Sequence, residues 1–98
     1  MAGVVAAAVA GPPVYAGDSA SGLYLARQWC VECHVVEAGQ ASASDAGPPF
    51  AEVAKNPAKT ERGLRAWLSD PHPPMPQLNL SKTEIENLLA YIQSLASD

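Results

Sequence analysis

The segment that most constrains this chain is residues 30–34, Cys-Val-Glu-Cys-His, a complete C-x-x-C-H pattern. Two cysteines at this spacing can each form a thioether with one vinyl group of a porphyrin. The next residue, His34, then lies under the iron, where its ring nitrogen can act as the proximal ligand. The pattern therefore predicts one covalently attached haem c, held by Cys30 and Cys33, around which the chain must fold.

Other interpretations of the same residues are weaker. A thioredoxin-like redox pair would lie beside a βαβ pattern, and the sequence shows no strand-like alternation. A zinc site would have to use every cysteine and histidine of the chain: Cys30, Cys33, His34 and His72. The adjacent Cys33 and His34 diverge too much to close a tetrahedron. A Cys30–Cys33 disulfide in an oxidising compartment is the purely structural alternative.

The N-terminal segment is expected to stand apart from the folded domain. Residues 1–16 are rich in Ala and Val and contain two small-residue sites for signal peptidase, one ending at Ala10 and one at Ala16. We therefore expect a signal peptide or leader at 1–16 and one mono-haem domain at 17–98. The leader is too short to cross a bilayer, which takes about 20 apolar residues, so no stable membrane span is expected.

The charge balance limits the possible partners. The chain carries 6 Lys and Arg against 10 Asp and Glu, a formal net charge of -4. An acidic protein of this kind is not expected to bind nucleic acid or an anionic membrane surface. The domain that follows the leader has about 80 residues, a size at which a protein core alone is marginal, so a bound haem would complete it.

Helical periodicity predicts an all-α domain of about four short helices, without strands. The expected helices cover residues 19–33, 50–54, 60–69 and 81–95, and residues 35–49 form a loop. Asp18 or Ser19 can cap the first helix, which places the C-x-x-C-H pattern at its C-terminal end. Pro71 disfavours helix at Asp70 and ends the third helix there.

The last helix has the strongest local signals. Ser81 and Glu84 form a capping box. Leu80 and Ile85 are placed for a hydrophobic staple. A hydrophobic stripe then follows one face of the helix: Ile85, Leu88, Leu89, Ile92 and Leu95. Such a stripe predicts a helix that packs in the core.

Met75 is the candidate for the second axial ligand. It is the one methionine outside the leader, and it lies in the proline-dense segment 70–78 between the third and fourth helices. Prolines fix φ and reduce the freedom lost on folding, so this loop can hold one side chain at a set position. A thioether is soft and neutral, and as an iron ligand it raises the potential.

His72 is the competing ligand, and bis-histidine ligation would lower the potential. Only three positions separate His72 from Met75, so both cannot bind one iron in a single loop conformation. His72 is more simply explained as an exposed loop histidine. We therefore expect His34 and Met75 to be the iron ligands.

Together these motifs resemble a small bacterial class I c-type cytochrome. The resemblance extends over residues 18–96 and rests on the C-x-x-C-H pattern, Gly47-Pro48-Pro49-Phe50, Leu64-x-x-Trp67-Leu68, and Pro74-Met75-Pro76 followed by the last helix. It implies the cytochrome c fold, in which the helices wrap around one haem. It also implies that the N- and C-terminal helices cross near Gly22 and Leu88 or Tyr91, where a glycine allows close approach.

The resemblance implies further roles for Pro48 and Trp67. The Pro48 carbonyl would accept the Nδ1 proton of His34, which fixes the tautomer and orientation of the ring. The doubled Pro48-Pro49 leaves open which carbonyl does this. Trp67 resembles the tryptophan that donates to a haem propionate, and from the sequence alone a buried core aromatic is an equal alternative.

The expected function is that of a one-electron carrier, not an enzyme, which cycles haem iron between Fe(II) and Fe(III) in the periplasm. It would be a free shuttle or the cytochrome subunit of a dehydrogenase. Its partners would be redox proteins (a periplasmic dehydrogenase, an oxidase or a membrane cytochrome complex) with a basic docking patch, because this chain lacks the lysine ring of mitochondrial relatives.

Two other functions remain open from the sequence. A haem-based ligand sensor or a peroxidase-like protein would need a labile sixth ligand and a distal acid or base, for which His72 is the available neutral base. A structural thiol or metal module would use the cysteines without haem. Neither accounts for a methionine bracketed by prolines.

Overall fold

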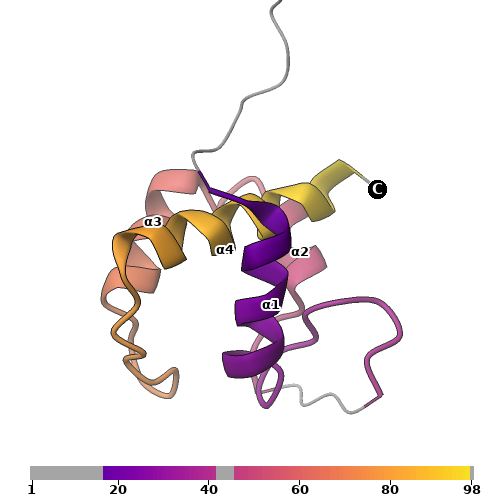
Figure 1. The fold of residues 1–98 in the computed structure, drawn as a ribbon, viewed down its shortest axis with the longest axis horizontal. Helices are drawn as coiled ribbons and strands as arrows, with labels where there is room; N and C mark the ends of the chain where they lie inside the picture. The colour runs from indigo at the N-terminus through magenta and orange to yellow at the C-terminus, as the bar shows by residue number, and fades with distance from the viewer. Residues whose placement is uncertain (1–16, 42–45, 98) are drawn as a thin grey trace, which may run out of the picture.

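The computed structural model describes residues 17–41 and 46–97, so the leader predicted at 1–16 lies outside the described residues. The described chain forms α1 (Ser19–Trp29), α2 (Phe50–Lys55), α3 (Glu61–Ser69), α4 (Lys82–Ser94) and a 3-10 helix, η1 (Leu95–Ser97) (Figure 1). No strand occurs in this part of the chain. The predicted all-α class is confirmed.

The first helix is shorter than predicted. It ends at Trp29, not at Cys33, and Cys30 is its C-cap, donating its N–H to the Ala26 carbonyl at 2.9 Å. Cys33 then donates to the Cys30 carbonyl, three residues back, at 3.2 Å. This tighter spacing is that of a turn and not of an α-helix. The C-x-x-C-H segment therefore lies just beyond the helix.

Side-chain caps lie at the starts of α1 and α4, where the sequence predicts them. The Asp18 carboxylate accepts the Ser21 N–H at 2.9 Å and caps α1. At α4 the capping box is complete, because Ser81 Oγ accepts from the Glu84 N–H at 3.1 Å while Glu84 Oε1 accepts from the Ser81 N–H at 2.8 Å. These bonds satisfy N–H groups that a helix start otherwise leaves unpaired.

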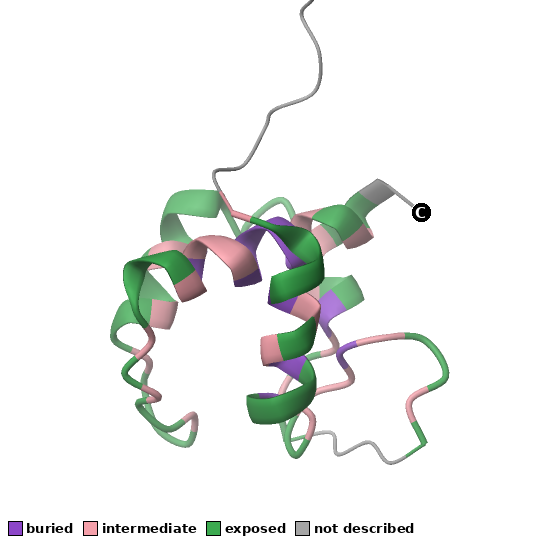
Figure 2. Ribbon diagram, viewed as in Figure 1, coloured by how far each residue is buried: buried purple, intermediate pink, exposed green. Residues whose placement is uncertain are grey.

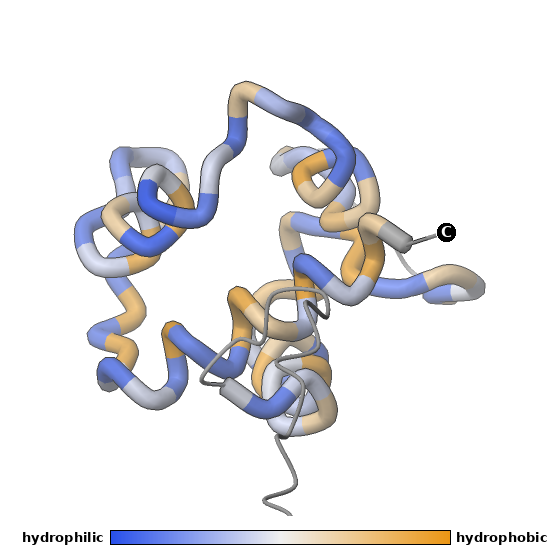
Figure 3. The backbone as a smooth tube through the Cα atoms, turned by 90° about the horizontal axis from the view of Figure 1, so that it is seen from above, coloured by the Kyte–Doolittle hydropathy of each residue, from blue (hydrophilic) through white to orange (hydrophobic). Residues whose placement is uncertain are grey.

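One face of α4 forms the centre of the core. Its buried residues include Leu88 and Leu89, at 2% and 0% exposure. Figure 2 shows buried positions gathered where α1, α4 and the start of α2 meet. In Figure 3 hydrophobic positions recur along the helices between hydrophilic ones, as amphipathic helices require.

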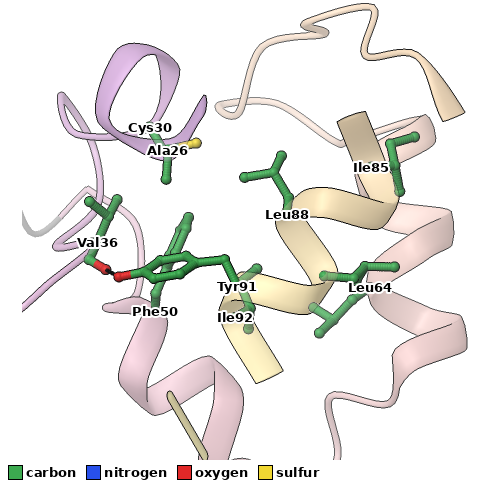
Figure 4. Packing of buried hydrophobic residues seen from close by; sticks show 10 residues of the cluster. Ala26, Cys30, Val36, Phe50, Leu64, Ile85, Leu88, Tyr91 and Ile92 are labelled. Atoms are coloured by element: carbon green, nitrogen blue, oxygen red, sulfur yellow. Dashed lines mark hydrogen bonds between the residues drawn. The ribbon is translucent and has the colours of Figure 1, made fainter. Parts of the chain in front are cut away.

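The loop after α1 is fastened to this core by Tyr91. Its phenol hydroxyl donates to the Val36 carbonyl, and its ring lies beside Phe50 with centroids 6.4 Å apart (Figure 4). Val36 itself is fully buried. The start of α2 and the loop that precedes it are thus held against α4 by packing and by one buried hydrogen bond.

The α1–α4 crossing depends on Gly22. A Cβ placed there would lie 2.0 Å from the Asn87 carbonyl oxygen and 2.7 Å from Tyr91 Cβ. The glycine was predicted at this crossing, with Leu88 or Tyr91 as its neighbour. The structure confirms Tyr91 as a neighbour, and the Asn87 carbonyl group, which precedes Leu88 in the chain, lies closest to Gly22. Only a residue without a side chain permits this distance between the helix backbones.

Helix α3 is joined to α4 by an ion pair. Arg65 Nε lies 2.7 Å from Glu86 Oε2 on α4, and Arg65 Nη2 lies 2.7 Å from Glu61 Oε1 on α3. The hydrogen bond from Arg65 lowers the pKa of the Glu86 carboxyl. The Glu86 carboxylate therefore stays ionised to lower pH than in the unfolded chain. The ion pair with Arg65 is lost only as the pH falls through the lowered pKa of Glu86.

Within residues 17–41 and 46–97, no helix combines the length and the apolar character that crossing a membrane needs.

The close crossing yields a test. Gly22→Ala should lower the free energy of unfolding by about 1–3 kcal/mol, the usual cost of forcing a group into a packed contact. Gly63→Ala on α3 is the matched control, because its Cβ would meet only Thr60 Oγ1, at 3.1 Å. Urea unfolding followed by circular dichroism measures both variants. Equal stability of the two would contradict the assignment of Gly22 to the crossing.

Candidate functional site

The two cysteines of the turn after α1 have different surroundings. Cys30 is 7% exposed and belongs to the core, whereas Cys33 is exposed. Both are free thiols, so the structure contains no Cys30–Cys33 disulfide. Two free thiols on one short turn are available for bonds to another group.

The chemistry of Cys30 argues against a thiolate site. Burial, with a smaller contribution from Cys33, raises the pKa of the Cys30 thiol to about 11. The thiol therefore stays protonated near neutral pH, unlike the low-pKa cysteines of redox-active pairs. In addition, no three Cys, His, Asp or Glu side chains are grouped to hold a metal ion in the part of the chain that is described.

His34 is oriented by a carbonyl group. Its Nδ1 lies 2.7 Å from the Pro48 oxygen, which selects Pro48 over Pro49 as the neighbour of the ring. A carbonyl oxygen can only accept, so the proton is on Nδ1 and the lone pair is on Nε2. The ring is thereby fixed in the tautomer that can bind a metal through Nε2.

Gly47 lies directly against the imidazole ring of His34. A Cβ at this glycine would lie 2.3 Å from His34 Cε1 and 2.7 Å from its Nδ1. Phe50 contacts the ring as well, with centroids 5.3 Å apart. The Gly47 N–H donates to the Cys33 carbonyl at 2.8 Å. The imidazole is thus held by backbone on one side and by an aromatic ring on another.

Gln40 is a positioning residue that the sequence analysis missed. Its amide oxygen accepts from the Val36 N–H at 2.8 Å, and its amide nitrogen donates to the His34 carbonyl at 3.1 Å. Nothing in a lone loop glutamine distinguishes it beforehand, because these bonds go to backbone groups and leave no pattern in the side chains of the sequence. It fixes the chain directly after His34.

The predicted second ligand lies in the loop that follows α3. Met75 is partly buried, and its Sδ accepts a hydrogen bond from Trp67 Nε1 at 3.1 Å. Trp67 is 40% exposed, so the interpretation of this residue as a buried core aromatic is wrong. His72 is exposed and contacts the Trp67 ring edge-on, with centroids 4.8 Å apart.

The two predicted parts of the site extend to the same side of α4. Figure 1 shows the turn at the end of α1 and the loop between α3 and α4 both descending from it. Within the described residues, no hydrogen bond or ring contact joins His34 to Met75. The site therefore consists of two preformed halves, each fixed by its own hydrogen bonds.

The available donors fit haem c. Free thiols on Cys30 and Cys33 match its vinyl groups, and the imidazole of His34 and the thioether of Met75 are common axial ligands. The decisive observation is the 2.7 Å contact between His34 Nδ1 and the Pro48 oxygen, since a proton on Nδ1 leaves Nε2 free to bind iron.

Comparison with known proteins agrees with this chemistry. The sequence model of the family described as Cytochrome c matches residues 19–96. Cytochrome c-552 of Bradyrhizobium diazoefficiens is 46% identical over 92 residues, which cover 94% of this chain and 88% of that protein. No solved structure is significantly similar to the chain.

Proposed function

The chain belongs to the cytochrome c family, and from this premise we propose that it is a periplasmic one-electron carrier, either a free shuttle or the cytochrome subunit of a dehydrogenase. As a member of the family it binds covalently attached haem c and is an electron-transfer protein. When bound, haem c supplies a one-electron Fe(II)/Fe(III) couple. The observation that carries the proposal is the 2.7 Å contact between His34 Nδ1 and the Pro48 oxygen.

The turn after α1 would provide three of the bonds to haem. Cys30 and Cys33 would hold haem c, because a thiol S–H can add across a vinyl group to give a thioether without a by-product. His34 would serve as iron ligand through Nε2. The hydrogen bond from its Nδ1 to Pro48 keeps the ring in place and makes the ligating nitrogen more basic.

Met75 would provide the second axial ligand. Its sulfur is already fixed by Trp67 in a loop rich in proline, so little further freedom is lost when it binds iron. A neutral thioether favours Fe(II) and raises the potential. His72 stays a loop residue, because its ring is exposed and rests on the Trp67 edge.

The partner would carry a basic docking patch. The formal charge of -4 is made more negative by the two propionates that haem c carries. Opposite charges on two proteins raise their encounter rate and orient them, while like charges exclude wrong partners. The periplasm is proposed because small c-type cytochromes of this kind mature outside the cytoplasm and because residues 1–16 have the composition of a signal peptide.

Covalent attachment can be tested directly. The protein, produced in a periplasm equipped for haem attachment, should keep one haem through acid–acetone extraction. The Cys30→Ala/Cys33→Ala double variant should have no bound haem and should be largely unfolded by circular dichroism, because a core of about 80 residues is marginal alone. A double variant that folds normally without haem would contradict the claim that haem completes the core.

The ligand assignment separates a carrier from a sensor or a peroxidase. The ferric protein should show the weak near-infrared band of a thioether–iron bond. Met75→Ala should lose the band and speed carbon monoxide binding to the ferrous protein by about tenfold or more. His72→Ala is the matched control from the same loop and should change neither property. Rapid carbon monoxide binding by the unmodified protein would favour the sensor.

The partner proposal predicts a salt effect. Raising the ionic strength from about 0.1 M to 1 M shortens the Debye length from about 10 to 3 Å. Electron exchange with a basic redox protein should slow accordingly, while exchange with a neutral small-molecule oxidant should barely change. Stopped-flow absorbance measures both rates. A salt-independent rate with a basic partner would indicate docking through apolar contacts instead.

A further inference from the structure

Gln40 binds three backbone groups of the segment that contains His34. Its amide nitrogen donates to the carbonyl oxygens of Val31 and His34, at 3.4 and 3.1 Å. Its amide oxygen accepts from the Val36 N–H at 2.8 Å. Val31 precedes His34 in the chain, and Val36 follows it. One side chain therefore connects the C-x-x-C-H turn to the segment that leaves it.

Water is a poor substitute for these bonds. Val36 is fully buried, so solvent cannot replace the Gln40 oxygen as the partner of its N–H. Gln40 itself is partly buried. A buried N–H that loses its acceptor carries the full cost of desolvation, so the backbone would have to move to reach another one. The position of the chain around His34 thus depends on the Gln40 amide.

The other hydrogen bonds of this segment do not reach the His34 carbonyl. The hydrogen-bonded carbonyls that Gln40 leaves to other donors belong to Cys30, Cys33, Val35 and Val36. They accept from backbone N–H groups or, at Val36, from the Tyr91 hydroxyl (Figure 4). Within the described residues, the donor to the His34 carbonyl is Gln40.

The imidazole of His34 depends on where this backbone lies. Its Nδ1 is 2.7 Å from the Pro48 oxygen. Pro48 follows Gly47, whose N–H donates to the Cys33 carbonyl at 2.8 Å. The acceptor is thus attached to the residue before His34, while Gln40 holds the carbonyl of His34 itself. Together the two attachments keep the ring nitrogen within reach of the Pro48 oxygen.

We propose that Gln40 is a positioning residue for the iron ligand: through the His34 carbonyl it keeps the imidazole on Pro48 in the haem-bound protein. The inference rests on the proposed role of His34 as ligand through Nε2. A ring whose other nitrogen donates to a carbonyl keeps one orientation and is a more basic ligand. Without the Gln40 amide the turn opens locally more often, and each opening exposes the Nδ1 proton of His34 to water.

Hydrogen exchange measures these openings. In the ferrous holoprotein, nuclear magnetic resonance follows the His34 Nδ1 proton together with the Glu84 N–H, which donates to Ser81 Oγ at the start of α4. Gln40→Leu should speed exchange of the His34 proton by about tenfold or more, because it removes both hydrogen-bonding ends of the side chain. Exchange of the Glu84 N–H should be unchanged.

Two further variants identify the cause. Gln28→Leu is the matched control, since Gln28 is exposed on α1 and its side chain bonds to no residue of the turn within the described chain. It should leave both protons unchanged. Gln40→Glu keeps an acceptor for the Val36 N–H but has no donor for the His34 carbonyl at neutral pH. It should speed exchange of the His34 proton as Gln40→Leu does, and it replaces Gln40→Leu if that variant does not fold.

The outcomes separate this inference from the function on which it rests. Unchanged exchange of the His34 proton in either Gln40 variant would overturn the inference, because Gln40 would then only stabilise the fold. Equal acceleration at Glu84 would also overturn it, because the opening would not be local to the turn. The unmodified protein should show His34 resonances shifted by the ring current of the haem. Their absence would overturn His34 as the ligand, and the inference with it.

Discussion

The crossing of α1 over α4 is the constraint on which the rest of the structure depends. It brings the backbones together at Gly22 and fixes the direction in which α1 leads into Cys30. Helix α3 is attached to the same α4 by Arg65 and Glu86. Both halves of the site, the turn after α1 and the loop after α3, are thus positioned relative to one helix whose apolar face forms the core.

Hydrogen bonds to backbone carbonyls then hold His34 and the loop around it in place. Pro48 accepts from His34, Val36 accepts from Tyr91, and the His34 carbonyl accepts from Gln40. Each bond satisfies a loop group that would otherwise need water. A loop without regular secondary structure can hold a ring nitrogen in a defined direction by this means.

Much of the fold could be predicted because its signals are local. The capping box of Ser81 and Glu84, the stop at Asp70 before Pro71, and the stripe on α4 each involve neighbouring residues. The end of α1 was placed too late because helical periodicity continues through the turn at Cys30. The environment of Trp67 could not be predicted, since its neighbours Met75 and His72 belong to a loop whose path is set by tertiary contacts.

The bond between Tyr91 and Val36 joins residues 55 positions apart and closes a loop that contains α2, α3 and Met75. The entropy of closing a loop rises slowly with its length, by about 0.6 kcal/mol for each doubling. Residues inserted between Val36 and Tyr91 should therefore cost little, whereas losing α4, which carries Tyr91, would open the loop altogether. Chains with this fold can therefore differ in length between α1 and α4 while keeping both of these helices.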